Sequence, residues 1–157
     1  MIFLDTDVCI EYLRGNERVK AKFRQFEPEG LAVSFMTAAE LLYGAEKSDN
    51  PDEIRMRVEE FLGFLNVVYG DENTVRTFGY VKAYLVRAGR AIPDADILVA
   101  AAALSRSCPL ATGNVRHFSR IWGLQLQDWF AESPLPAGRH ATPRANLGRQ
   151  LNRNEPL

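Results

Sequence analysis

Acidic residues border short apolar segments at three places that are far apart in the sequence. Asp5 ends the run Ile2-Phe3-Leu4, Glu40 follows a second apolar segment, and Asp96 directly precedes the stretch ILVAAAAL. Carboxylates packed together repel one another, and a hard divalent cation such as magnesium or manganese relieves that repulsion. A cation held in this way can activate a water molecule and stabilise negative charge on a phosphodiester. These residue types therefore indicate metal-assisted hydrolysis, provided that the fold brings them together.

Short apolar segments alternate with amphipathic segments along the chain. We expect strands at residues 2–4, 31–35, 66–69, 109–112 and 124–126. We expect helices at 7–14, 17–26 and 72–88, and further helices that begin at Thr37, Pro51 and Pro93. Such alternation predicts an α/β fold, a central parallel sheet of four to five strands flanked by helices on both faces. Ligands of such sheets gather beyond the carboxyl ends of the strands, where Asp5, Glu40, Asp96 and Asn114 would meet.

Each of these residues also has a purely structural interpretation. Asp5 could cap the helix that follows it, and Thr37 with Glu40 has the spacing of a capping box. Asp94 and Asp96 both occupy a helix N-terminus, where the helix dipole favours acids, and periodicity does not choose between them. Asn114 is typical of a turn, and we interpret His117 as a surface or packing residue of a helix rather than a catalytic base.

Composition and charge set limits on the class of protein. The 157 residues have a net charge of −1, and 46% of them are hydrophobic. Residues 131–157 hold four arginines against two glutamates, a net charge of +2, which leaves −3 on the first 130 residues. We therefore expect one domain over residues 1–130 and a proline- and arginine-containing tail over 131–157 that is flexible in isolation. Without a broad basic face, metal ions would have to supply much of the attraction for phosphate.

Cysteine content and hydropathy predict a cytoplasmic protein. Cys9 and Cys108 lie in apolar surroundings, so we expect both to be reduced core residues. No segment has the roughly 20 consecutive apolar residues that span a bilayer. The N-terminal sequence MIFLDTD has no basic region and is unlike a secretory signal.

Five segments of the chain resemble the PIN-domain family and, within it, the VapC-like toxins of bacterial toxin–antitoxin pairs. They cover residues 2–130 in the family's order and read FLDTDVCIEYLRG, TAAELLYGAEKS, IPDADILVAAAAL, LATGNVRHFSRIWGL and QLQDWF. The resemblance implies a magnesium- or manganese-dependent endoribonuclease that is usually dimeric and is inhibited by a cognate antitoxin.

The resemblance also implies roles for individual residues. By position, Asp5, Glu40 and Asp96 match the family's metal-binding acids, and Asp94 becomes an auxiliary acid of the rim. Thr112 and Asn114 match polar positions beside the metal, and we take Asn114 as a further catalytic residue. Many relatives carry an acid where this chain has Asn114 or His117, so a fourth carboxylate is missing. Asp7 stands where asparagine is frequent and could partly restore the lost charge.

Two alternatives to a metal-dependent ribonuclease remain. The sequence LDTDV also suits a phosphatase of the haloacid-dehalogenase type, with Asp5 as nucleophile and Asp7 as general acid. That class needs a later lysine, and the chain has none after Lys82. The second alternative is a PIN-like module that binds RNA or a protein partner and cleaves nothing.

Overall fold

A five-stranded parallel sheet forms the centre of the protein. The computed structural model describes residues 1–131. The strands are β1 (Ile2–Leu4), β2 (Leu31–Ser34), β3 (Asn66–Val68), β4 (Leu110–Thr112) and β5 (Leu126–Asp128). They lie in the order β3-β2-β1-β4-β5, and every neighbouring pair is parallel. The predicted fold class is therefore confirmed.

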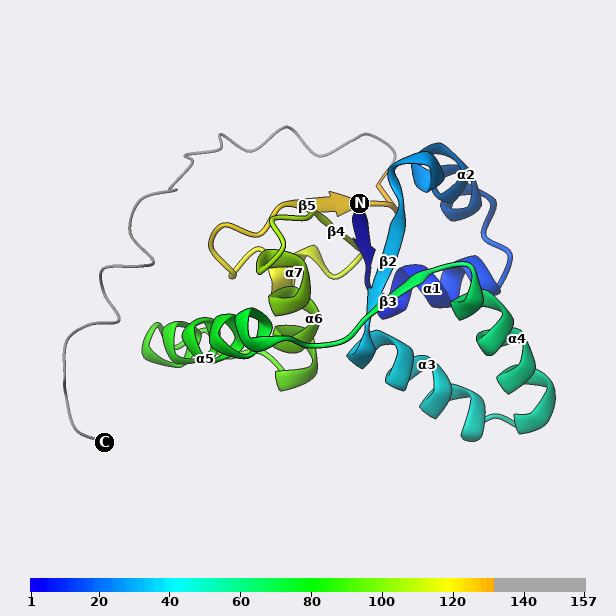
Figure 1. The fold of residues 1–157 in the computed structure, drawn as a ribbon, viewed down its shortest axis with the longest axis horizontal. Helices are drawn as coiled ribbons and strands as arrows, with labels where there is room; N and C mark the ends of the chain where they lie inside the picture. Colours follow the sequence, from blue (N-terminus) through cyan, green and yellow to red (C-terminus); the bar gives the residue numbers. More distant parts are fainter. Residues whose placement is uncertain (132–157) are drawn as a thin grey trace.

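Helices cover both faces of the sheet (Figure 1). On one side lie α1 (Thr6–Leu13), α2 (Glu17–Phe26), α3 (Phe35–Glu46) and α4 (Pro51–Gly63), with a 3-10 turn at Glu27–Glu29 after α2. On the other side lie α5 (Glu72–Arg87), α6 (Asp94–Leu104) and the short α7 (Val115–Phe118). Strands β1, β2 and β4 are buried between these two layers, which explains their continuous apolar character, whereas the edge strands β3 and β5 are only partly buried.

Strand alternation divides the apolar side chains into two cores. Ile2 and Leu4 of β1 point into a cluster with residues of α1, α2 and α4, including Val8, Phe23 and Phe61. Phe3, between them, points into the opposite cluster, which is formed with α5 and α6. In α6 the residues Val99 to Ala103 are all buried, as the apolar stretch ILVAAAAL requires.

The start of helix α3 and the position of strand β5 each differ by two residues from the prediction, and each difference has a local reason. Helix α3 begins at Phe35 rather than Thr37, because the Ser34 hydroxyl accepts a hydrogen bond of 3.0 Å from the Thr37 amide and so caps the helix. Strand β5 starts at Leu126, two residues later than expected, because Leu126 pairs with Leu110 while Leu124 packs against the second core.

The cysteine prediction holds in part. Both cysteines are free, and Cys9 is fully buried, but Cys108 is only half-buried. Among residues 1–131, no helix is long and apolar enough to cross a membrane. The tail predicted over 131–157 lies, from residue 132 on, outside the described residues.

Candidate active site

Asp5 lies at the carboxyl end of the sheet, where β1 ends and α1 begins. Its side chain is only 7% exposed. One carboxylate oxygen accepts a hydrogen bond of 2.8 Å from the Thr6 amide, and the other accepts one of 2.7 Å from the Thr112 hydroxyl. Each oxygen keeps a lone pair for a further partner. Both interpretations of Asp5 therefore apply together, since it caps α1 and also faces the end of β4.

Burial makes the negative charge of Asp5 costly. It raises the pKa of Asp5 from 3.8 to about 7, with further contributions from the charge of Asp7 and, less, from that of Asp96. The hydrogen bonds from Thr112 and Thr6 lower this pKa but do not offset the burial. A divalent cation beside Asp5 would relieve both the burial penalty and the repulsion between carboxylates.

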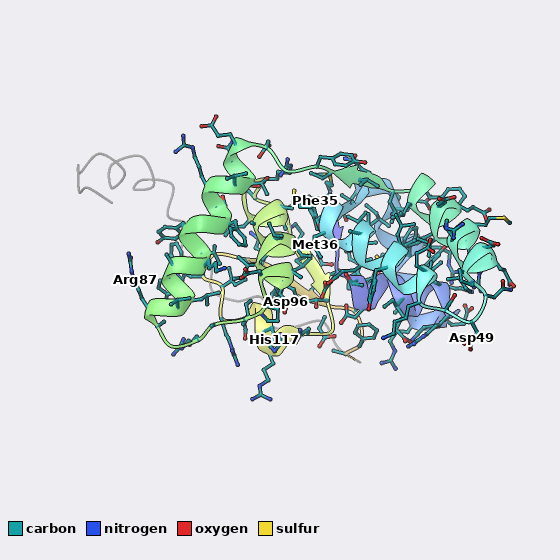
Figure 2. All side chains as sticks on the ribbon, turned by 90° about the horizontal axis from the view of Figure 1, so that it is seen from below. Phe35, Met36, Asp49, Arg87, Asp96 and His117 are labelled. Carbon is teal, nitrogen blue, oxygen red and sulfur yellow. The ribbon has the colours of Figure 1, made fainter. Side chains whose placement is uncertain are left out.

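A chain of polar contacts leads from Asp5 to Asp96. The Thr112 hydroxyl, which donates to Asp5, accepts a hydrogen bond of 2.9 Å from the Asn114 amide nitrogen of the backbone. The Asn114 side-chain nitrogen lies 2.9 Å from Nδ1 of His117, and the same Nδ1 lies 2.9 Å from Oδ2 of Asp96. Figure 2 shows Asp96 and His117 side by side in a view onto this edge of the sheet.

Glu40 joins the same chain of contacts from the other direction. The Thr6 hydroxyl donates a hydrogen bond to Oε2 of Glu40, while the Thr6 backbone amide donates to Asp5. Because Ser34 caps α3, the expected pairing of Glu40 with Thr37 in a capping box is wrong, and Glu40 is available to the site. The structure thus links Glu40, Asp5 and Asp96, which are distant in sequence. We call this chain of contacts, Glu40–Thr6–Asp5–Thr112–Asn114–His117–Asp96, the polar chain.

Asp7 and Asp128 form a second acidic region next to the polar chain. One oxygen of Asp7 accepts a hydrogen bond of 2.9 Å from the Gly113 amide. Burial raises the pKa of Asp7, and the charge of Asp128 raises it further. Asp128 was not predicted to be a site residue. The available signal was its place in the segment QLQDWF, where it is the last residue of β5, much as Asp5 directly follows β1.

Asp94 lies outside the polar chain, whereas His117 lies within it. The Asp94 carboxylate lies 2.6 Å from Nζ of Lys82 on α5, and within residues 1–131 the structure does not bring it into the polar chain; its auxiliary role stays a prediction. His117 was expected to be a surface or packing residue, yet it connects Asp96 to Asn114. His117 lies on the short helix α7, so its expected place on a helix is confirmed, but its contact with Asp96 was not predicted.

The site suits a water-rich cation site rather than a closed cage. Within residues 1–131, no three His, Cys, Asp or Glu side chains are arranged to hold a metal ion by themselves. Magnesium commonly binds through one or two carboxylates, with waters and substrate phosphate completing its octahedron. The oxygen donors of Asp5 and Asp96 fit that pattern, and Glu40 lies one hydroxyl group away from Asp5.

Comparison with known proteins decides the family. The family model described as PIN domain matches residues 2–123. The chain belongs to the PIN domain family. Its similarity extends to the VapC group, as the resemblance implied. A tRNA(fMet)-specific endonuclease VapC of Shigella flexneri is 33% identical and covers 80% of this chain and 96% of its own length. A ribonuclease VapC2 of Haemophilus influenzae is 34% identical with the same coverage.

Solved structures agree with this assignment to the PIN domain family. DNA-bound VapBC from Salmonella typhimurium has a TM-score of 0.78 at 33% identity, covering 82% of this chain and 97% of that chain. VapBC-1 from nontypeable Haemophilus influenzae has a TM-score of 0.75 at 37% identity, covering 82% and 98%. The prediction of a PIN domain is confirmed, and the phosphatase alternative is wrong.

Proposed function

We propose that this PIN domain is a divalent-metal-dependent endoribonuclease that acts in the cytoplasm as the toxin of a toxin–antitoxin pair. The observation that carries the proposal is the polar chain, which gathers Glu40, Asp5 and Asp96 at the carboxyl edge of the sheet. The ribonuclease names of the VapC relatives support the reaction class. The acids at this edge support hydrolysis of an RNA phosphodiester bond.

Asp5 and Asp96 would hold the cation, Mg²⁺ or Mn²⁺, with Glu40 beside them. When bound, the ion supplies Lewis acidity and lowers the pKa of a water molecule. The protein's own contribution is to fix the ligands before substrate arrives. Thr6 and Thr112 hold the two oxygens of Asp5, and His117 holds Asp96, so each carboxylate has a defined orientation. Asp7 adds negative charge behind Asp5, which favours a cation there.

Cleavage of RNA by a matched pair of variants tests this proposal. Purified protein is incubated with initiator tRNA, the substrate named for the Shigella relative, in Mg²⁺ or Mn²⁺. Asp96→Asn should lower the cleavage rate by about 100-fold or more, because it removes a ligand charge. Asp94→Asn, two residues away on the same helix, should cleave at the parent rate, because Asp94 pairs with Lys82.

The same assay separates the nuclease from a non-catalytic module. The lack of a three-residue metal cage within residues 1–131 favours this second candidate. The assay is repeated with ribosomal RNA and messenger RNA. If Asp96→Asn cleaves each RNA as fast as the parent does, or if neither protein cleaves any of them, the nuclease proposal fails. Binding of RNA without any metal-dependent cleavage would then favour the module.

Partners follow from the VapBC assemblies among the solved structures. We propose that a cognate antitoxin binds this chain, and that the free toxin is a homodimer. Large apolar side chains are exposed on the described surface, among them Phe64 and Tyr69, which are 75% and 74% exposed. Light scattering on purified protein should give the mass of two chains. Co-expression with the product of a neighbouring small reading frame should abolish cleavage.

A further inference from the structure

Positive charge gathers on the layer of helices that carries Asp96. Residues 72–125, which include α5, α6 and α7, hold seven arginines and lysines against three acids, a net charge of +4. Residues 1–71, which include the helices of the opposite layer, carry a net charge of −6. We infer that Arg90, Arg116 and Arg120 form a binding surface for the backbone phosphates of RNA next to the scissile bond. The inference rests on the proposed function, because it concerns the path of the same RNA.

Acidic side chains occupy only three of the seven cations. The pairs are Arg76 with Glu72 at 2.6 Å, Lys82 with Asp94 at 2.6 Å and Arg106 with Asp71 at 2.9 Å. The remaining acid of this segment, Asp96, contacts His117. Within residues 1–131, four arginines of the segment form no ion pair, namely Arg87, Arg90, Arg116 and Arg120. Phosphate can therefore bind them without first displacing a carboxylate of this part of the chain.

Arg116 and Arg120 lie beside the contact between His117 and Asp96. Arg116 directly precedes His117 on α7, and its side chain is exposed. Arg120, just after α7, is half-buried and donates a hydrogen bond of 3.4 Å to the Ala91 carbonyl. This bond joins the end of α7 to the loop that leads into the first turn of α6, where Asp96 lies.

The same loop carries Arg90, and the end of α5 fixes its position. Gly89 has a φ of +64°, and its amide donates to the Val86 carbonyl, while the Arg90 amide donates a hydrogen bond of 2.9 Å to the Leu85 carbonyl. These bonds form a Schellman motif, which holds the backbone of Arg90 while its side chain stays exposed. Arg87 is not part of the surface, because Figure 2 shows it at one end of the molecule, away from Asp96. The helix dipole accounts for Arg87 in the last turn of α5. We call Arg90, Arg116 and Arg120 the arginine surface.

The charge distribution favours one direction for the bound RNA. A strand whose scissile phosphate lies beside Asp96 must place its neighbouring phosphates over an adjoining part of the protein. Over residues 1–71 these phosphates would meet net negative charge. Over the arginine surface they meet guanidinium groups, which bind two phosphate oxygens at once. The RNA should therefore continue over α7 and the loop between α5 and α6.

The salt dependence of RNA binding by the full chain tests the inference. Every protein in this assay carries Asp96→Asn, which keeps the RNA intact, and the probe is initiator tRNA. The triple variant Arg90→Gln, Arg116→Gln, Arg120→Gln should bind about 100-fold more weakly at about 0.1 M salt. Its slope of log affinity against log salt should be shallower by about 2, because three phosphate contacts are lost.

Three further variants control for charge and for folding. Lysine at the same three positions should keep the slope, because lysine also displaces counterions. Arg116→Gln alone changes an exposed side chain and should make the slope shallower by about 0.7. Arg55→Gln removes the same charge from α4, where Arg55 contacts Glu46 at 2.7 Å, and should keep the parent slope. Melting temperatures show whether each variant is folded.

The outcomes separate this inference from the proposed function. If the triple variant keeps the parent affinity and slope, or if Arg116→Gln changes the slope no more than Arg55→Gln does, the inference is overturned. Loss of antitoxin binding with unchanged RNA binding in the triple variant would assign the surface to a protein partner and overturn it too. Weaker RNA binding by the triple variant, with no metal-dependent cleavage by the chain that keeps Asp96, would uphold the arginine surface and overturn the nuclease.

Discussion

Asp5 combines strong burial with nearby negative charge. It is 7% exposed, and Asp7 follows it by two residues. The resulting pKa of about 7 lies above the value of about 4 expected in the unfolded chain. Ionised Asp5 therefore destabilises the metal-free fold. Asp5, the residue most important for binding the cation, thus lowers the stability of the protein when no cation is bound.

Asp5→Asn should stabilise the metal-free protein at high pH and abolish RNA cleavage. Well below pH 4, Asp5 is protonated in both the folded and the unfolded state, so its ionisation has no effect on stability. As the pH rises from 4 to 7 the unfolded chain loses this proton while the folded protein keeps it, so parent stability falls, and above pH 7 the full cost is reached. The measurement is the melting temperature of Asp5→Asn minus that of the parent, with EDTA present. This difference should be about 5 °C larger at pH 8 than at pH 4.

A surface aspartate provides the control for this melting experiment. Asp49 is exposed and lies far from Asp96 at the edge of the molecule (Figure 2). Asp49→Asn should follow the parent melting curve at both pH values. Addition of Mn²⁺ should raise the parent melting temperature at pH 8 and leave that of Asp5→Asn nearly unchanged. Equal pH dependence in the parent and Asp5→Asn would contradict the burial argument.

The site could be predicted only in part from individual residues. Asp5 was found because a carboxylate at the end of an apolar strand is unusual, but Glu40 fitted a capping box equally well. The side chains of Asp94 and Asp96 leave α6 in directions about 200° apart, and the sequence did not show which of the two faces the sheet edge. His117 was assigned a structural role because its partner Asp96 is 21 residues away, and only tertiary structure reveals that contact.

At the scale of elements, the loop after β4 is held in place by the end of the domain. Gly113 donates its amide to Asp7, and the Phe130 ring packs over it. A Cβ atom added at Gly113 would lie 2.4 Å from Cδ2 of Phe130 and 2.9 Å from Oδ2 of Asp7. Arg18 of α2 donates a hydrogen bond of 2.7 Å to the Phe130 carbonyl. These contacts fix the loop that carries Thr112 and Asn114.

Gly113→Ala should therefore lower both stability and metal affinity. The added methyl group has no space, and such overpacking costs about 1–3 kcal/mol of unfolding free energy. Chemical denaturation measures that loss, and titration with Mn²⁺ should show weaker binding because Thr112 and Asn114 shift. The double variant Gly113→Ala, Phe130→Ala should recover part of the metal affinity.

Gly79 provides the matched control for this substitution. It lies in α5, and a Cβ atom there meets nothing within 4 Å. Gly79→Ala should raise the unfolding free energy by up to about 1 kcal/mol through helix propensity. If Gly113→Ala does not lower the unfolding free energy relative to the parent, steric contact with Phe130 is not the reason for glycine at position 113.

The elements themselves were largely predictable because their signals are local. Pro51 is the first residue of α4, and Pro93 directly precedes α6. The order of strands is not local. The β-α alternation indicates parallel pairing but does not place β1 between β2 and β4, which results from packing two sets of helices on opposite faces. The start of β5 was missed because pairing with Leu110, rather than hydrophobicity, selects Leu126.

For the whole molecule, the uneven charge bears on how RNA is held. Residues 1–130 carry a net charge of −3 and residues 131–157 carry +2, which includes Arg139, Arg144, Arg149 and Arg153. We therefore expect the cation, and contacts between RNA and these arginines, to supply much of the attraction for phosphate. Arginine also matches carboxylate geometry, so the tail could instead pair with the acidic site and restrain it.

Removal of residues 132–157 should weaken RNA binding more than it changes catalysis. Binding is measured with the Asp96→Asn variant, which keeps the RNA intact. Removal of the tail should make the slope of log affinity against log salt shallower by up to about 3, because each of the four arginines displaces less than one counterion. The melting temperature of the shortened chain serves as the control for folding. If the slope is unchanged and the shortened chain with Asp96 intact cleaves RNA faster than the full chain, the tail restrains the site.

The strand order also determines when a growing chain can become active. Asp5 is made before the other members of its site, which are not complete until residue 117 has been added, and β5 follows them. A ribosome translating this message therefore holds an incomplete and harmless nuclease until these segments have been made. The RNA of that ribosome, and the messenger that it reads, face a competent enzyme only when the last strand can pair.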